Sequence, residues 1–240
     1  MNGIRAENLS YAYSVGKNGE RAAISDLTVG FSAGEFNVLV GYSGCGKTTL
    51  LKIIAGLIDD YDGELYIGDE NAADLTIGQR GVSFVAQDFT LYPHLTIFDN
   101  IAFPLRTEKL PREVIVERVL WFADKLGIKH CLTRKPKNIS IGQQQRAAIA
   151  RALVKKPEIC LLDEPFSNVD PLLRAEARAM LKKVLKETGC TVVYVTHDLN
   201  EAVSLADKLF VMDNGSLAVG GDPKAVYNSD NAVVRALKGL

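Results

Sequence analysis

The sequence predicts an α/β fold with a largely parallel sheet, an antiparallel edge near the N-terminus and an inserted helical segment. Two observations predict it. Short apolar runs alternate with longer helical patterns along most of the chain, and residues 88–156 contain no convincing strand. We therefore expect one domain over residues 1–240, with an α/β core (1–87 and 157–240) and a helical subdomain (88–156).

The predicted strands fall into two groups. The first thirty residues alternate between polar and apolar positions around a turn at Gly16, Asn18 and Gly19, which predicts an antiparallel pair. Later apolar runs are rich in Val, Ile, Leu and Phe, as in strands that are buried on both faces. These runs are residues 36–40, 82–85, 159–162, 192–195 and 209–212.

Helices are predicted where apolar residues recur with helical spacing. These segments are residues 47–57, 112–126, 143–154, 172–187 and 199–206, with a shorter candidate at 232–238. Asp170 and Pro171 supply an N-cap and a first-turn proline, and Gly127 and Gly189 follow helical stretches as C-caps.

The composition excludes several classes of protein. The chain has 28 Lys and Arg against 29 Asp and Glu, and this near-neutral charge argues against a nucleic-acid partner. No apolar run is long enough to span a bilayer, and residues 1–7 lack the layout of a secretory signal. The four cysteines form no C-x-x-C pair, which argues against a zinc knuckle or a redox motif. We expect a cytoplasmic protein.

Residues 41–48, Gly-Tyr-Ser-Gly-Cys-Gly-Lys-Thr, fit the pattern G-x-x-x-x-G-K-[ST] between a strand and a helix. Glycines let backbone N–H groups converge on a phosphate at the positive end of a helix dipole. A glycine-rich turn is the plain alternative, but the strand–loop–helix context favours a phosphate site. The expected nucleotide contacts are Gly41, Tyr42, Ser43, Gly44, Cys45, Gly46, Lys47, Thr48 and Thr49.

Within this loop, Lys47 adds a point charge for the β- and γ-phosphates, and the hydroxyl of Thr48 is suited to ligate Mg²⁺. We expect Cys45 to fill space rather than act as a nucleophile, with its thiol pKa lowered by the electropositive loop.

The strand at 159–162 ends in two carboxylates, Asp163 and Glu164. An acidic residue at this end of a strand, beside a phosphate loop, suits an Asp that organises Mg²⁺, and Glu164 would then orient or deprotonate the attacking water. An acidic pair alone is more often a solvated loop start, but the nearby phosphate loop favours the catalytic interpretation.

Residues 139–146, Ile-Ser-Ile-Gly-Gln-Gln-Gln-Arg, resemble the signature motif of the nucleotide-binding subunits of ABC transporters. The resemblance covers essentially the whole chain. Tyr13 matches the aromatic residue that stacks on adenine, Gln87 the Q-loop glutamine, residues 167–170 the D-loop, and His197 the switch histidine. The resemblance implies a P-loop NTPase (RecA-like) core with an antiparallel β edge subdomain and an inserted α-helical subdomain.

The resemblance also implies ATP and Mg²⁺ as cofactors, with Thr48, Gln87 and Asp163 on the metal. It implies Lys47, Gln87, Glu164 and His197 as the catalytic residues. His197 would contact the γ-phosphate and hold Glu164 and its water in line.

Two subunits are expected to close head-to-tail, so that each ATP lies between the phosphate loop of one and the signature of the other. The signature contacts would be Ser140, Gly142 and Gln143, and the resemblance adds Asp170 of the D-loop. The family usually has Gly where this chain has Ile141. A β-branched residue resists positive φ, so either Ile141 points away from the nucleotide or the signature is weaker. Because Glu164 and His197 are intact, we expect an active ATPase.

The resemblance implies transmembrane permease subunits and a solute-binding protein as further partners. Residues 92–105 are similar to importer ATPases, which favours an ABC importer, peripheral on the inner face of the cell membrane through its permease. Such subunits often carry a C-terminal regulatory domain, which we expect to be absent after Leu240. The alternatives are a low-turnover regulatory ABC protein, a non-transport ABC ATPase acting on DNA or ribosomes, and a P-loop kinase.

Overall fold

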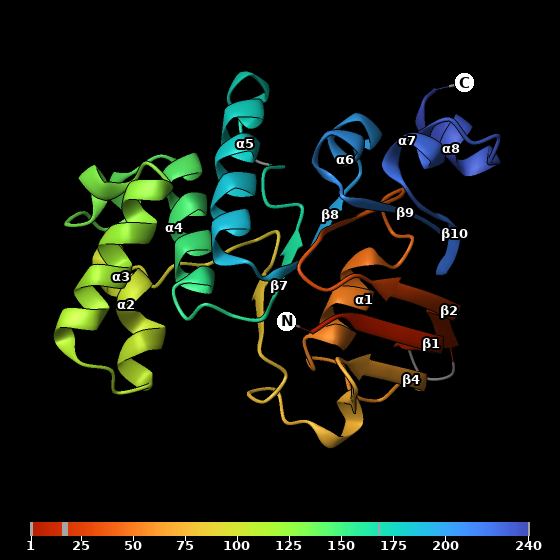
Figure 1. Cartoon of the computed structure of the whole chain (residues 1–240), viewed down its shortest axis with the longest axis horizontal. Helices are drawn as coiled ribbons and strands as arrows, with labels where there is room; N and C mark the ends of the chain where they lie inside the picture. The colour runs from red at the N-terminus through yellow and green to blue at the C-terminus, as the bar shows by residue number, and fades with distance from the viewer. Residues whose placement is uncertain (1, 16–18, 168, 240) are drawn as a thin grey trace.

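The structure is a computed structural model that describes residues 2–15, 19–167 and 169–239. Most of the turn predicted at residues 16–19 lies outside the described residues. Figure 1 shows helices α2, α3 and α4 together at one end of the molecule, and the small sheet with β1, β2 and β4 at the other end. The larger sheet runs from β7, beside the helical end, to β9 and β10, which lie above the small sheet in this view.

The larger sheet has the strand order β10-β9-β3-β8-β7-β6. Its strands are β3 (Phe36–Val40), β6 (Val82–Val85), β7 (Ile159–Asp163), β8 (Thr191–Thr196), β9 (Lys208–Asp213) and β10 (Ser216–Gly221). All neighbours are parallel except β9 and β10. The five predicted strands are confirmed to within one residue at each end. Because parallel strands share a direction, the carboxyl ends of β3, β7 and β8 meet at one edge.

The smaller sheet is antiparallel, in the order β2-β1-β4-β5. It contains β1 (Ile4–Val15), β2 (Gly19–Phe31), β4 (Asp62–Ile67) and β5 (Glu70–Asn71). The predicted antiparallel pair is therefore confirmed. The sequence did not predict β4 and β5, because residues 62–71 are mostly polar and the strands are short.

Two hydrophobic clusters form the core, one on each face of the larger sheet. On one face, helix α1 (Lys47–Ile54) is packed between the two sheets, with Leu50, Leu51 and Ile53 fully buried. On the other face, alternate residues of the same strands, such as Val38 and Val40, belong to a cluster that includes the remaining helices.

The remaining helices are α2 (Ile97–Thr107), α3 (Arg112–Lys125), α4 (Ile141–Leu153), α5 (Pro171–Thr188), α6 (Leu199–Leu205), α7 (Pro223–Tyr227) and α8 (Ala232–Leu237). Short 3₁₀ turns occur at Ala72–Asp74, Lys129–Cys131 and Pro136–Asn138. Residues 88–156, all of which the structure describes, contain no strand. Gly127 and Gly189 have φ of 64° and 71°, so both predicted C-caps are confirmed. In the part of the chain that the structure describes, no helix is long and apolar enough to cross a membrane.

Two helix boundaries differ from the prediction by more than one residue. Helix α1 ends at Ile54 rather than at residue 57, because the left-handed Gly56, with φ of 74°, breaks the pattern. Helix α4 begins at Ile141 rather than at residue 143, because the Ser140 hydroxyl accepts a hydrogen bond from the backbone N–H of Gln143 and the Gln143 side chain bonds back. This capping box moves the helix start to the signature itself.

Candidate nucleotide site

A cavity of about 430 Å³ lies at the carboxyl edge of the parallel strands. Ten residues predicted from the sequence line it: Tyr13, Ser43, Gly44, Gly46, Lys47, Thr48, Thr49, Gln87, Glu164 and His197. Three further lining residues were not predicted: Arg21, Ala22 and Ala23. They come from β2, whose register places Arg21 opposite Tyr13, so correct alignment of the hairpin could have found them. The structure therefore brings six segments of the chain to one site.

The phosphate loop is held in a conformation that requires glycine. Gly46 has φ of 105°, and a Cβ there would lie 2.2 Å from the backbone oxygen of Ala23. A Cβ at Gly41 would lie 2.3 Å from the backbone oxygen of Met212. Helix α1 begins directly after Gly46, so its N-terminal N–H groups face the cavity end of the loop. This geometry suits an anion.

The Lys47 ammonium is buried within the loop. Its Nζ donates hydrogen bonds to the backbone oxygens of Gly41 (2.8 Å) and Tyr42 (2.9 Å). Gly41, Tyr42 and Cys45 themselves do not line the cavity. They shape the loop from behind, with Gly41 and Cys45 buried and Tyr42 exposed.

The expectation of a lowered Cys45 pKa is wrong. Burial raises the pKa of the Cys45 thiol, and the nearby Lys47 lowers it by less. The buried thiol is therefore less ionised than a free cysteine, even though it lies in an electropositive loop.

The acidic strand end supplies a buried carboxylate. Asp163 is only 3% exposed at the end of β7, and burial raises the pKa of its carboxyl, while a hydrogen bond from the Thr48 side chain and the charge of Lys47 oppose this shift. Thr48 and Gln87 are exposed and line the cavity. One carboxylate with hydroxyl and amide oxygens nearby is a donor set suited to Mg²⁺, which keeps several waters and takes few carboxylates. These three residues therefore fit the metal.

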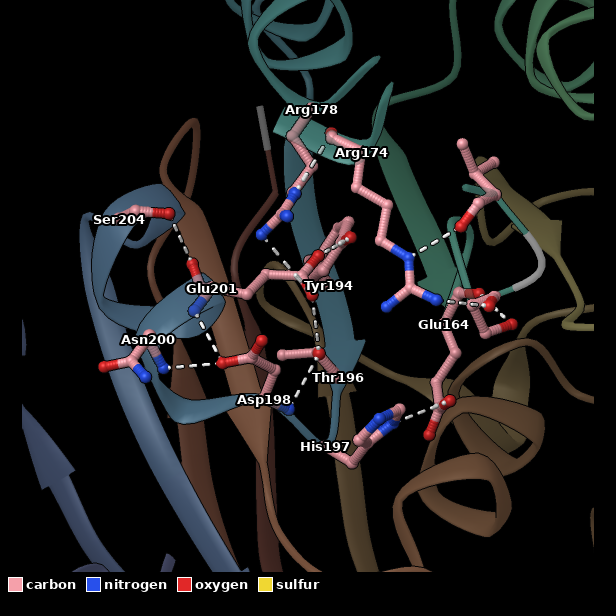
Figure 2. Close-up of polar contacts among 12 residues, drawn as sticks. Glu164, Arg174, Arg178, Tyr194, Thr196, His197, Asp198, Asn200, Glu201 and Ser204 are labelled. Atoms are coloured by element: carbon pink, nitrogen blue, oxygen red, sulfur yellow. Dashed lines mark hydrogen bonds and ion pairs between the residues drawn. The ribbon is translucent and has the colours of Figure 1, made fainter. Parts of the chain in front are cut away.

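Glu164 and His197 form a hydrogen-bonded pair at the cavity. Figure 2 shows the imidazole pointing at the carboxylate, and Nδ1 of His197 lies 3.0 Å from Oε2 of Glu164. With an ionised carboxylate as the acceptor, Nδ1 would be the donor of this contact, which would leave Nε2 for a ligand. The pair is possible because Glu164 follows β7, His197 follows β8, and these strands are parallel neighbours.

The backbone of Glu164 is strained. It has φ of 44°, in the left-handed region, and its N–H donates to the backbone oxygen of Val195 at 3.1 Å. A non-glycine residue persists there only when its surroundings hold it, and such residues cluster at functional sites.

Tyr13, on β1, also lines the cavity. Its hydroxyl is 3.3 Å from Oγ1 of Thr49, and its ring packs edge-on against Tyr11 with centroids 4.9 Å apart. The ring is partly exposed, at 37%. These contacts fix the ring while leaving part of it open to the cavity.

The signature residues line a different cavity. Ser140, Ile141, Gly142 and Asp170 lie around a space of about 380 Å³, and none of them reaches the first cavity. The side chain of Gln143 bonds back to Ser140 and also lies 3.2 Å from Nε2 of His130. Within one chain, the predicted contacts therefore belong to two separate places.

Ile141, where the family usually has glycine, adopts a helical backbone. It is the first residue of α4 and is absent from the residues with positive φ, so it bears no left-handed strain. Its side chain is 58% exposed. The backbone at this position therefore accepts a β-branched residue, and whether Ile141 points away from the nucleotide or weakens the signature stays a prediction.

The family model described as ABC transporter matches residues 24–167, more than half of the chain. The chain belongs to the ABC transporter family. Among solved structures, a dimeric ATP-binding cassette in a post-hydrolysis state, bound to ADP and phosphate, has a TM-score of 0.82 with 31% identity, covering 92% of this chain and 98% of that one. The predicted α/β fold, a P-loop NTPase core with an antiparallel edge and inserted helices, is confirmed.

Curated ABC relatives are also similar. The trehalose/maltose import ATP-binding protein MalK of Thermococcus litoralis is 46% identical over 216 residues, which are 88% of this chain and 58% of the relative. The maltose/maltodextrin import ATP-binding protein MalK of Escherichia coli K12 is 43% identical over 228 residues, 95% of this chain and 60% of the relative. The chain thus spans about 60% of the length of these relatives.

Proposed function

We propose that this chain is the ATP-hydrolysing subunit of an ABC importer. The observation that carries the proposal is the Glu164–His197 pair at a cavity that also contains the phosphate loop. The names of the MalK relatives, which are import ATP-binding proteins, support the direction of transport. Residues 1–240 would act as one ATPase domain, with 88–156 as its helical subdomain.

ATP would enter with its base at Tyr13 and its phosphates at the loop. The backbone N–H groups after Gly46 and the ammonium of Lys47 would hold the β- and γ-phosphates. Tyr13 would stack on adenine with the part of its ring that is open.

Hydrolysis would depend on the carboxyl edge of the sheet. Glu164 would orient and deprotonate the attacking water, and His197 would hold Glu164 in line and contact the γ-phosphate through Nε2. Thr48, Gln87 and Asp163 would hold Mg²⁺, which when bound neutralises developing phosphate charge.

A second copy or a homologue would complete the site. Ser140, Gly142 and Gln143 open helix α4 on the other cavity, where they would meet the γ-phosphate held by a partner's loop, with Asp170 at the same seam. The dimeric state of the similar cassette supports the pairing of two such subunits.

Permease subunits would dock on a cavity of about 520 Å³ beside the segment after Gln87, where Phe89, Tyr92 and Phe103 are partly or largely exposed. A solute-binding protein would deliver the cargo, and the subunit would lie on the inner face of the cell membrane through its permease. Co-purification with a multispanning membrane protein tests this part.

Glu164→Gln is the test of the enzymatic proposal. It removes the base while keeping the side-chain size, so ATP turnover is expected to fall about a hundredfold. Glu113→Gln, an exposed change of the same kind on α3, is the control and is expected to keep full turnover. Wild-type turnover in the Glu164 variant would refute the role of Glu164. Background turnover in the wild type with its permease would favour the low-turnover regulatory protein instead.

A further inference from the structure

We propose that Glu201 and Arg174 are positioning residues that hold the two ends of the Glu164–His197 pair. The inference rests on the proposed ATPase function of that pair. Figure 2 shows the polar contacts that connect these residues. The contacts form a closed circuit with two branches. The first branch connects His197 to Glu201, helix α5 connects Glu201 to Arg174, and the second branch connects Arg174 to Glu164.

The first branch holds His197 from both sides along the backbone. The Thr196 hydroxyl donates to Oε2 of Glu201 at 3.1 Å, and the backbone N–H of Asp198 donates to the same hydroxyl oxygen at 3.1 Å. The residues before and after His197 are therefore bound together, with Glu201 behind them. The hydroxyl of the buried Tyr194 donates to the other oxygen of Glu201. Only 11% of the Glu201 side chain is exposed.

Helix α5 connects the two branches. Nη1 of Arg178 lies 3.7 Å from Oε2 of Glu201, and both side chains are largely buried, which weakens solvent screening of the pair. Nε of Arg178 donates to the backbone oxygen of Arg174 one turn earlier, at 3.1 Å. Glu201 on α6 is thus tied to the helical turn that carries Arg174.

The second branch holds the segment that follows Glu164. Nε and Nη2 of Arg174 donate to the backbone oxygens of Val169 (2.8 Å) and Ser167 (3.0 Å). The backbone N–H and the hydroxyl of Ser167 in turn donate to the backbone oxygen of Glu164, at 3.2 and 3.1 Å. Because Glu164 has a left-handed φ of 44°, its backbone needs such external restraint to stay in place.

The circuit closes through the 3.0 Å contact between His197 and Glu164. Catalysis by a base depends on placing its oxygen correctly, and small misplacements cost large factors in rate. Neither Glu201 nor Arg174 lines the cavity. Their loss should therefore lower kcat without changing the binding of MgATP.

Glu201→Gln tests the first branch. The amide keeps the shape but has only one accepting oxygen and no charge, so it cannot accept from both Tyr194 and Thr196 or form an ion pair with Arg178. We expect kcat to fall roughly tenfold while KM for MgATP stays within about twofold. Asn200→Ala, an exposed change on the same helix, is the matched control and should leave both unchanged. A rise in KM with unchanged kcat would overturn the proposal.

Arg174→Lys tests the second branch independently, should the first variant fold poorly. Lysine keeps the charge but not the forked geometry that spans two carbonyl oxygens, so kcat is again expected to fall with KM preserved. An unchanged kcat in this variant would contradict the inference. A higher KM for MgATP with no change in kcat would contradict it as well.

A double-mutant cycle with His197→Ala separates positioning from general destabilisation. If Glu201 acts through His197, adding Glu201→Gln to His197→Ala lowers kcat by less than about twofold further, whereas independent effects multiply. Multiplying losses would overturn the proposal. If Glu164→Gln kept wild-type turnover, the proposed function itself would fail. If that variant is inactive but Glu201→Gln is fully active, only the positioning role fails.

Discussion

The phosphate loop and the signature segment are both glycine-containing turns at the start of a helix, but they differ in how closely the rest of the chain packs around them. Gly46 has a positive φ, and backbone atoms of Ala23 leave no room for a Cβ there. Its neighbour Lys47 is buried and donates hydrogen bonds to backbone carbonyl oxygens. Around Gly142 a Cβ would meet nothing within 4 Å, and Ile141 is 58% exposed. Residue choice is thus dictated inside the chain at the first turn. At the second turn it is not, so a requirement for glycine there would come from the proposed partner subunit.

Gly46→Ala and Gly142→Ala give the largest test of this contrast. At Gly46 the new Cβ collides with the backbone of Ala23 and the φ is unfavourable, so the free energy of unfolding should fall by about 3 kcal/mol. At Gly142 the change should stay within about 0.5 kcal/mol, because the helix start accepts alanine. Urea unfolding of both variants measures the difference. Equal losses would contradict the contrast.

Mixing two inactive variants tests whether the exposed turn serves another subunit. Lys47→Ala disables the loop, and Gly142→Asp places negative charge beside the expected γ-phosphate. In a head-to-tail dimer each variant alone lacks both sites, whereas mixed dimers have one intact site, so the mixture should recover about a quarter of wild-type turnover. The assay is ATP turnover with permease present. A mixture no more active than its components would argue against composite sites.

The buried Asp163 makes the stability of the phosphate-loop region depend on pH. Burial raises the pKa of its carboxyl above the ordinary 3.8, so the folded state holds the proton more tightly. Its contribution to stability is therefore fully present below the unfolded pKa and is lost as pH rises through the folded pKa. Asp163→Asn removes this loss. Without metal, the Tm of the variant should exceed that of the wild type near pH 7, and the difference should shrink toward about pH 4.

Thermal unfolding in a chelator measures the effect of Asp163→Asn. Asp222→Asn provides a control, because Asp222 lies in the exposed cap of α7 rather than in a buried strand end. A variant Tm below that of the wild type throughout this pH range would contradict the role of burial.

Sequence reasoning located the parallel strands well because each is a short, continuous apolar run buried on both faces. It missed α2, whose segment has an aromatic-rich beginning and Pro104 inside the helix, so the helical spacing was obscured. It also missed β4 and β5, which owe their place to pairing with β1 rather than to their own composition.

The same division holds at the site. The phosphate loop, Asp163 and Glu164 were predicted because short sequence patterns identify them: the glycine spacing of the loop and the acidic pair that follows an apolar strand. Arg21 was missed because its place depends on the register of β1 and β2. The Cys45 pKa was predicted in the wrong direction because the sequence shows the neighbouring lysine but not the burial that outweighs it.

The smallest expected effect is that of Ile141→Gly, which would restore the residue usual in the family. Ile141 has helical rather than left-handed backbone and a largely exposed side chain, so nothing inside the chain requires glycine at this position. Glycine at the first turn of α4 should cost at most about 1 kcal/mol, and turnover should stay within roughly twofold of the wild type. Steady-state ATP turnover with permease present is the measurement. A large gain in turnover would show that the exposed isoleucine obstructs the phosphate bound to the partner subunit. The partner would then restrict the residue at position 141, although nothing within the chain does.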